Sequence, residues 1–365
     1  MTNWKQGSVL GAAVLLGLLG LGEAVRIAIV RFALDDFRLY YAAAQVGLSH
    51  GFWRIYDAGL ERAAVATLTP GGDWFPYLNP PPLAWLAAPF TLLPFTAAFA
   101  GWFLLMLIAV VAAALLAAPP EGRARLLFIG LGIGLFPTAW ALGAGQVVPL
   151  LMLSLVASWR LLKAERQVLA GVVLAATVLK PQLALLVPFC LLAAGRPKVF
   201  LAWAGTAAVL AALSLASLGQ DGVRQYLEAL GGASIFFSER RWALTTFLGP
   251  AGIYAQAGVV IIALAAAFRH RSRGIEIPIL AGVVGSVLAS PYFNAPDFAI
   301  LGAAGWIWAR GDAFVGRAWL LGLAFLTVEF AQAIEIPVVT VEVAILLALV
   351  LVRPAAGPAQ APATA

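Results

Sequence analysis

Long runs of uncharged, mostly apolar residues recur through the whole sequence. The clearest cover residues 96–118, 199–218 and 245–268, and none of these contains a charged side chain. A helix needs about 20 such residues to cross the hydrocarbon core of a bilayer. Charged residues make up only 11% of the chain, against about 25% in typical soluble domains. The chain is therefore predicted to be an all-α polytopic membrane protein.

Shorter apolar runs fill the space between the long ones. Because several are too short for a perpendicular span, they are predicted to be half-helices or re-entrant pieces. Together the runs predict one transmembrane domain over residues 1–353, with about 10 to 13 transmembrane or half-membrane helices, and a disordered tail over 354–365. A first run, over residues 8–32, continues through Glu23 and Arg26 and is expected to be the first transmembrane helix. The shorter runs cover residues 82–94, 126–143, 147–162, 168–180, 182–195, 276–290, 297–310, 317–334 and 337–352.

Basic residues gather in short clusters between the apolar runs, which sets the expected orientation, since cytoplasmic loops carry an excess of Lys and Arg. With the N-terminus inside, the outer face receives residues 33–81, the Gly145-Gln146 turn, the loop 219–244 and the turn 290–297. The alternation of inner and outer segments is consistent only if the run 82–94 does not cross the membrane. A signal peptide is the alternative for the first run. The expected location is the cell (inner) membrane. The clusters include Arg123, Arg125, Arg160, Lys163, Arg166, Arg196, Lys198, Arg269, Arg271, Arg273, Arg310, Arg317 and Arg353.

Two adjacent carboxylates, Asp35 and Asp36, follow the first apolar run. A carboxylate at the membrane edge is costly, so a functional role is the first hypothesis. We expect Asp36 to be a catalytic base, with Tyr40 on the same helix face one turn later. Asp35 is a candidate for substrate binding, and helix capping is its alternative role.

Two breaks within apolar sequence carry polar side chains. Gln146 follows the Gly143-Ala144-Gly145 turn, where it is expected either to bind a hydroxylated substrate or to satisfy loose backbone groups. Lys180, followed by Pro181, interrupts a run from Val168 to Gly195. A lysine at membrane depth needs a partner or a wet cavity. We expect its ammonium to meet a substrate phosphate, with snorkelling to the interface as the alternative.

Five further residues are candidates for substrate binding. Tyr77 and Asn79 precede three consecutive prolines and are expected to line a sugar site or to belong to a stiff linker. Arg240 and Arg241 form a guanidinium pair suited to phosphate, or belong to a solvated helix face. Asp297 starts an apolar run, where capping and a site role are equally expected.

The order of these motifs resembles that of glycosyltransferase family 87, membrane enzymes of the GT-C type similar to polyprenol-phosphate-mannose-dependent alpha-1,2-mannosyltransferases. The resemblance implies that Asp36 is the catalytic base, that the donor is a polyprenyl-phosphate sugar, and that the site lies at the outer face. One departure concerns the sugar and acceptor, because Tyr292 stands near the Ser-Pro turn, where those enzymes tend to carry His. The motifs are Asp36-Phe37, Tyr40-Tyr41, Ala43, Gly51 to Asp57, Tyr77 to Pro82, Pro89, Pro94, Gly145-Gln146, Ala170-Gly171, Lys180-Pro181 and Ser290-Pro291-Tyr292.

The expected reaction moves a hexose or pentose, with mannose expected first, to a lipid-linked or glycan acceptor with inversion. Asp36 would deprotonate the acceptor hydroxyl while cations stabilise the leaving phosphate. No cofactor is expected, although the residues leave open whether a divalent ion takes part in the reaction. No nucleic-acid partner is expected. The alternatives are a non-catalytic membrane scaffold, a polymer ligase and a secondary transporter. A transporter would show corresponding interrupted segments in two halves.

Overall fold

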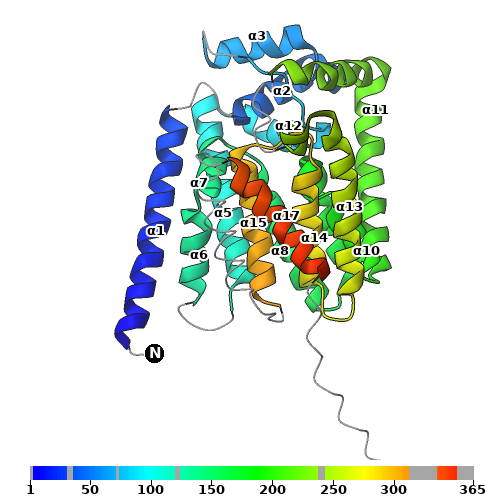
Figure 1. The fold of residues 1–365 in the computed structure, drawn as a ribbon. Helices are drawn as coiled ribbons and strands as arrows, with labels where there is room; N and C mark the ends of the chain where they lie inside the picture. The colour runs from blue at the N-terminus through cyan, green and yellow to red at the C-terminus, as the bar shows by residue number, and fades with distance from the viewer. Residues whose placement is uncertain are drawn as a thin grey trace, which may run out of the picture.

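The structure is a computed structural model that describes residues 3–30, 36–70, 74–119, 124–236, 243–311 and 335–351. Within these ranges the chain forms α-helices, short 3-10 helices and turns, and no strand is present. Upright helices form a bundle, and shorter helices lie across one end of it (Figure 1). The predicted class, an all-α polytopic membrane protein, is confirmed.

Within the part of the chain that the structure describes, four helical stretches are long and apolar enough to cross a membrane. They are Leu10–Val30 in α1 (Asn3–Val30), Phe95–Ala117, which is α5, Pro197–Gly232 in α11 (Pro197–Phe236), and Leu244–Arg269. The last stretch joins α12 (Leu244–Leu248), η6 (Gly249–Ala251) and α13 (Gly252–Arg269). The last three spans contain the three long uncharged runs of the sequence, except for Ala118, whereas Leu10–Val30 carries Glu23 and Arg26.

The other apolar runs within the described residues form broken or short helices, as expected. The predicted run 317–334 and the predicted disordered tail 354–365 lie outside the described residues. Residues 126–143 fold as a pair, α6 (Ala124–Gly134) and α7 (Phe136–Gly143), which bend by 65°. Pro137 stands in the first turn of α7, where a missing backbone N–H costs no helical hydrogen bond. The remaining elements are α8 (Val148–Lys163), α9 (Gln167–Leu174), η4 (Ala175–Leu179), η5 (Pro181–Leu183), α10 (Leu186–Ala193), α14 (Glu276–Ala289), η7 (Ala295–Phe298), α15 (Ala299–Ala309) and α17 (Glu335–Leu351).

A layer of helices covers one end of the bundle. We call it the cap layer, and it consists of α2 (Asp36–His50), η2 (Phe52–Arg54), α3 (Ala58–Leu68) and residues 220–236 of α11 (Figure 1). The last part lies in the predicted outer loop 219–244, where the chain stays helical to Phe236 after a kink at Gly219, which has φ 58°. Glycine adopts this backbone conformation without a steric penalty.

The run 82–94 forms two short helices, α4 (Pro81–Ala87) and η3 (Ala88–Leu92). Pro81 and Pro82 stand in the first turn of α4, where proline is tolerated. Neither helix is long enough to span a bilayer. That the run 82–94 does not cross the membrane stays a prediction.

Glycines let α1 pack directly on α6. A Cβ atom on Gly20 would lie 2.3 Å from the carbonyl oxygen of Ile133, and one on Gly130 would lie 2.1 Å from that of Ala13. Such distances leave no room for a side chain on either helix. Close approach through small residues is typical of helix pairs in membranes.

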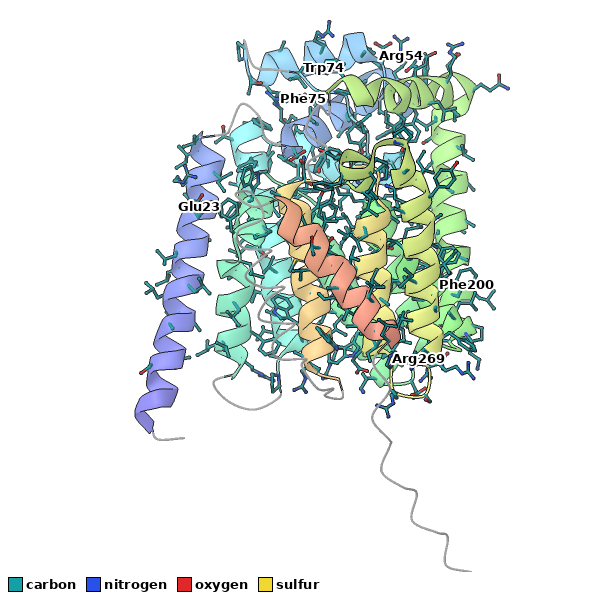
Figure 2. The ribbon with its side chains drawn as sticks, viewed as in Figure 1. Glu23, Arg54, Trp74, Phe75, Phe200 and Arg269 are labelled. Carbon is teal, nitrogen blue, oxygen red and sulfur yellow. The ribbon has the colours of Figure 1, made fainter. Side chains whose placement is uncertain are left out.

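The two ends of the bundle differ in charge. Arg160 and Lys163 lie in the last turn of α8, and Arg269 in the last turn of α13. Arg269 and the N-terminus lie at the end away from the cap layer, which carries Arg54 (Figures 1 and 2). The basic turns and the cap layer thus lie at opposite ends.

Candidate functional site

Asp36 is the first residue of α2 and lies against the turn between α7 and α8. Its backbone N–H donates to the carbonyl oxygen of Ala144 (2.9 Å), and its Oδ2 accepts a hydrogen bond from Nε2 of Gln146 (2.6 Å). The residue as a whole is of intermediate exposure. The turn at Gly143 to Gln146 therefore holds the start of α2 through both backbone and side chain.

Lys180 lies at the break between η4 and η5. Its backbone there leaves helical geometry, with φ −148° and ψ 75°, and its side chain is buried. Its Nζ donates to Oε1 of Gln146 (3.0 Å) and forms an ion pair with Oδ1 of Asp297. The lysine therefore has protein partners at membrane depth, which is what its burial requires.

Asp297 takes part in a capping box and in an ion pair; the N-cap residue itself is Asn294, and a role of Asp297 in substrate binding stays a prediction. It is the third residue of η7, where its Oδ2 accepts a hydrogen bond from the backbone N–H of Asn294 (3.1 Å) in a capping box. Its other oxygen pairs with Lys180, and its side chain is completely buried. Within the same turn the Asn294 amide donates to the Tyr292 hydroxyl.

Gln146 stands at the centre of these contacts. Its Oε1 also accepts a hydrogen bond from the hydroxyl of Tyr40 (3.2 Å), one turn after Asp36. We call Asp36, Tyr40, Gln146, Lys180 and Asp297 the polar cluster. All are at least nine-tenths buried except Asp36, which is only partly so. Four separate segments that the sequence singled out thus meet, and Asp36 is the least buried member of the cluster.

The surroundings of Asp36 shift its proton affinity. Burial raises the pKa of its carboxyl to about 6, the negative charge of Asp297 adds to this rise, and Lys180 and the Gln146 hydrogen bond oppose it. A carboxyl with a pKa near 6 binds a proton more tightly than an ordinary one and is still ionised near neutral pH. That combination suits a general base.

Arg38 is a charged neighbour that sequence reasoning missed. Its side chain is 1% exposed, its Nη1 donates to Oγ1 of Thr69 (2.7 Å), and its charge lowers the pKa of Asp36. Its position two residues after Asp36 could have suggested a role in the site. Nothing in the local sequence, however, indicates that a guanidinium at this position is buried.

Tyr77 belongs to a layer of tyrosines that packs against Tyr40 of the polar cluster, and Asn79 contacts this layer through its backbone. Tyr77 is buried, with its ring 6.3 Å from that of Tyr40 and its hydroxyl donating to the Pro80 carbonyl oxygen. The Tyr56 ring stacks on it at 5.6 Å, and the Tyr56 hydroxyl donates to the carbonyl oxygen of Asn79 (2.7 Å). This layer packs the 77–80 segment against the cluster.

The layer of tyrosines reaches the cap layer. The Tyr226 ring of α11 stacks on Tyr56 with a centroid distance of 4.5 Å, and its hydroxyl donates to the carbonyl oxygen of Leu78 (3.4 Å). The part of α11 after Gly219 is thereby fixed over the segment that leads to the site.

Three predicted site residues, Asp35, Arg240 and Arg241, lie outside the described residues. Within the described ranges, no group of three or more His, Cys, Asp or Glu side chains is placed to hold a metal ion. The absence of a cofactor stays a prediction.

Comparison with known proteins gives one finding. The model of glycosyltransferase family 87 matches residues 77–328, which is more than half of the chain. The matched region contains Gln146, Lys180 and Asp297, whereas Asp36 precedes it. No curated protein and no solved structure matches the chain.

Proposed function

The chain belongs to glycosyltransferase family 87, and from this membership and the polar cluster we propose that it moves a sugar from a polyprenyl-phosphate donor to an acceptor hydroxyl, with Asp36 as the base. The family makes the protein a membrane glycosyltransferase. The donor, the acceptor and the role of Asp36 are the proposal.

The observation that carries this proposal is the position of Asp36 at the accessible end of a buried polar cluster. A general base must be ionised, must be reachable by the substrate and must be held in a fixed place. Hydrogen bonds from Gln146 and to Ala144 fix Asp36, and the buried Lys180 keeps a positive charge nearby.

The proposed step is a single displacement. Asp36 takes the proton of the acceptor hydroxyl as the acceptor oxygen bonds to the anomeric carbon. The bond from that carbon to the phosphate oxygen breaks at the same time, and polyprenyl phosphate leaves with the bonding electrons. The anomeric configuration is thereby inverted.

Positive charge near the leaving phosphate would lower the barrier. Lys180 is one candidate, although its ammonium is already paired with Asp297. We propose Arg240 and Arg241 as further contacts to the phosphate. They follow the cap-layer part of α11 in the chain, and a guanidinium binds phosphate with two parallel hydrogen bonds.

Charge also supports an outer-face site. The N-terminus and the basic turns lie at the end opposite the cap layer (Figures 1 and 2). Since positive loops stay in the cytoplasm, we propose that the cap layer faces outward from the cell (inner) membrane. Glycolipids and glycans of the cell envelope are then the acceptors within reach.

A donor panel tests this proposal. Purified protein in lipid vesicles would be incubated with envelope lipid extract and, one at a time, radiolabelled polyprenyl-phosphate sugars, beginning with mannose. Sugar nucleotides would serve as the comparison. We expect label to move from a polyprenyl-phosphate sugar to a lipid or glycan product. Transfer from sugar nucleotides alone would overturn the proposed donor class.

A further inference from the structure

We propose that Gln146 is a positioning residue for Asp36: its amide holds Oδ2, keeps the carboxylate ionised and leaves Oδ1 to take the acceptor proton. The inference rests on the proposed function. It replaces the substrate contact expected from sequence, because the Gln146 side chain is only 3% exposed and its amide groups bind protein partners.

The orientation of the Gln146 amide is fixed by its neighbours. Its Oε1 accepts hydrogen bonds from two groups, the Lys180 ammonium (3.0 Å) and the Tyr40 hydroxyl (3.2 Å). An ammonium can only donate. A flipped amide would set its NH2 group against that ammonium and its oxygen against the Asp36 carboxylate. The observed orientation is therefore the one in which Nε2 faces Asp36.

The backbone on either side is equally fixed. The N–H of Gln146 donates to the carbonyl oxygen of Ala141 (2.8 Å), and the indole N–H of Trp102 donates to that of Gly145 (2.8 Å). Across the turn, the N–H of Asp36 donates to Ala144. With both partners anchored, the bond of 2.6 Å to Oδ2 has a set direction. Among the described residues, no donor lies on Oδ1.

The amide donor favours the ionised form of Asp36, because a hydrogen bond to a carboxylate is lost or weakened when that carboxylate is protonated. The other charged and titratable groups around Asp36 are Lys180 and Arg38, which favour ionisation, and Asp297, which opposes it. The Tyr40 hydroxyl binds Gln146, and Asp35, next in the chain, lies outside the described residues. Replacing Gln146 alone leaves these charges in the chain, but it also removes the oxygen that accepts hydrogen bonds from the Lys180 ammonium and the Tyr40 hydroxyl.

The test is an infrared pH titration of the full-length protein in lipid vesicles. The carboxyl band of Asp36 is identified as the one absent from Asp36→Asn. In Gln146→Met, which keeps the shape of the side chain but lacks the N–H, we expect the protonation midpoint to rise by about one pH unit, as for a lost charge-assisted hydrogen bond. Gln146→Leu serves as a second variant if the first does not fold.

Trp102→Phe is the matched control. It loosens the same turn by removing the bond to Gly145 but leaves the amide donor in place, so we expect a lower melting temperature with an unchanged midpoint. An unchanged midpoint in both Gln146 variants would overturn the inference. So would an equal rise in Trp102→Phe, since the effect would then be structural.

Kinetics with radiolabelled polyprenyl-phosphate mannose separates the two possible roles of Gln146. A positioning role predicts a lower kcat with little change in KM, whereas substrate binding predicts a higher KM. If Asp36→Asn retains wild-type turnover, the proposed function fails. If Asp36 is essential but Gln146→Met changes only KM, the positioning role alone fails.

Discussion

The side-chain amide of Gln146 donates a 2.6 Å hydrogen bond to the Asp36 carboxylate, although 110 residues separate the two in the chain. This contact joins the start of α2 to the turn between α7 and α8. Lys180 binds the same amide from the break between η4 and η5, and Asp297 holds Lys180 from η7. Helix breaks within the bundle therefore supply most of the polar cluster.

The first prediction concerns pH. Burial raises the pKa of Asp36 to about 6, so the proposed base is protonated below that pH and the transfer rate should fall about tenfold per further pH unit. Transfer rates measured from pH 4.5 to 8 would show an acid limb centred near pH 6. A limb at the ordinary carboxyl value of about 4 would contradict the assignment.

The Lys180–Asp297 pair should act as a unit in stability. Asp297→Ala leaves the buried Lys180 without its counter-charge, which should lower the free energy of unfolding by about 3 to 5 kcal/mol. The double variant Lys180→Met with Asp297→Leu should recover most of that loss, because no unpaired charge is left buried. Thermal unfolding in detergent checks both variants. Equal melting temperatures of the single and double variants would argue against a coupled pair.

Gly145 should be much less replaceable than another glycine of similar backbone conformation. Gly145 has φ 68°, and a Cβ there would lie 2.6 Å from Cβ of Phe37, whereas Gly195 has φ 80° and no neighbour within 4 Å. Gly195→Ala should cost about 1 kcal/mol from strain alone. Gly145→Ala should cost several times more and should displace α2 and reduce transfer. Similar melting temperatures of the two variants would contradict this view of the turn.

Packing of α1 gives another matched pair. A Cβ on Gly20 would meet the backbone of α6, whereas Gly22, two residues later, has nothing within 4 Å. Gly20→Leu should separate α1 from α6 and lower the yield of folded protein, and Gly22→Leu should be tolerated. Fluorescence-detected size exclusion after detergent extraction compares them. Loss of folded protein with Gly22→Leu alone would show that α1 packs through a different face.

Glu61, in α3 of the cap layer, predicts a pH dependence of stability. Burial raises the pKa of Glu61 from 4.5 to about 8. The hydrogen bond that its carboxylate accepts from the Tyr77 N–H opposes part of this rise. The folded state therefore holds this proton more tightly than the unfolded state, and stability should fall as pH rises from about 4.5 to about 8. Glu61→Gln should reduce that slope. Glu228→Gln, at an exposed position on α11, should leave it unchanged.

Much of the fold and most of the cluster were predictable from sequence. Uncharged runs fix spans because a bilayer admits only helices with satisfied backbones, and Lys180 revealed itself because a lysine at membrane depth needs partners. Because a polar group in lipid costs free energy, a polar side chain within an apolar run indicates a structural or functional role. Gln146 and Asp297 were found at breaks for the same reason.

The partners within the cluster could not be predicted. Nothing local in the sequence indicates that Gln146 bridges Asp36 and Lys180, because that contact depends on how α2 packs on the α7–α8 turn. Burial of Arg38 and the continuation of α11 beyond Gly219 also depend on tertiary packing of the cap layer. The apolar contacts that hold this helix on the cap layer, such as the Tyr226 ring on Tyr56, join residues far apart in the chain and cannot be predicted from the local sequence.

The most direct test of the central claim is turnover by Asp36→Asn, with Asp221→Asn as the matched control. Asp221 is an exposed carboxylate of the cap layer and pairs with the nearby Arg224. Both variants would be compared with wild type in vesicles under saturating polyprenyl-phosphate mannose. Our account predicts that Asp36→Asn loses at least about 100-fold in rate, as expected when a general base is removed, while Asp221→Asn retains wild-type turnover. Wild-type turnover by Asp36→Asn would contradict it.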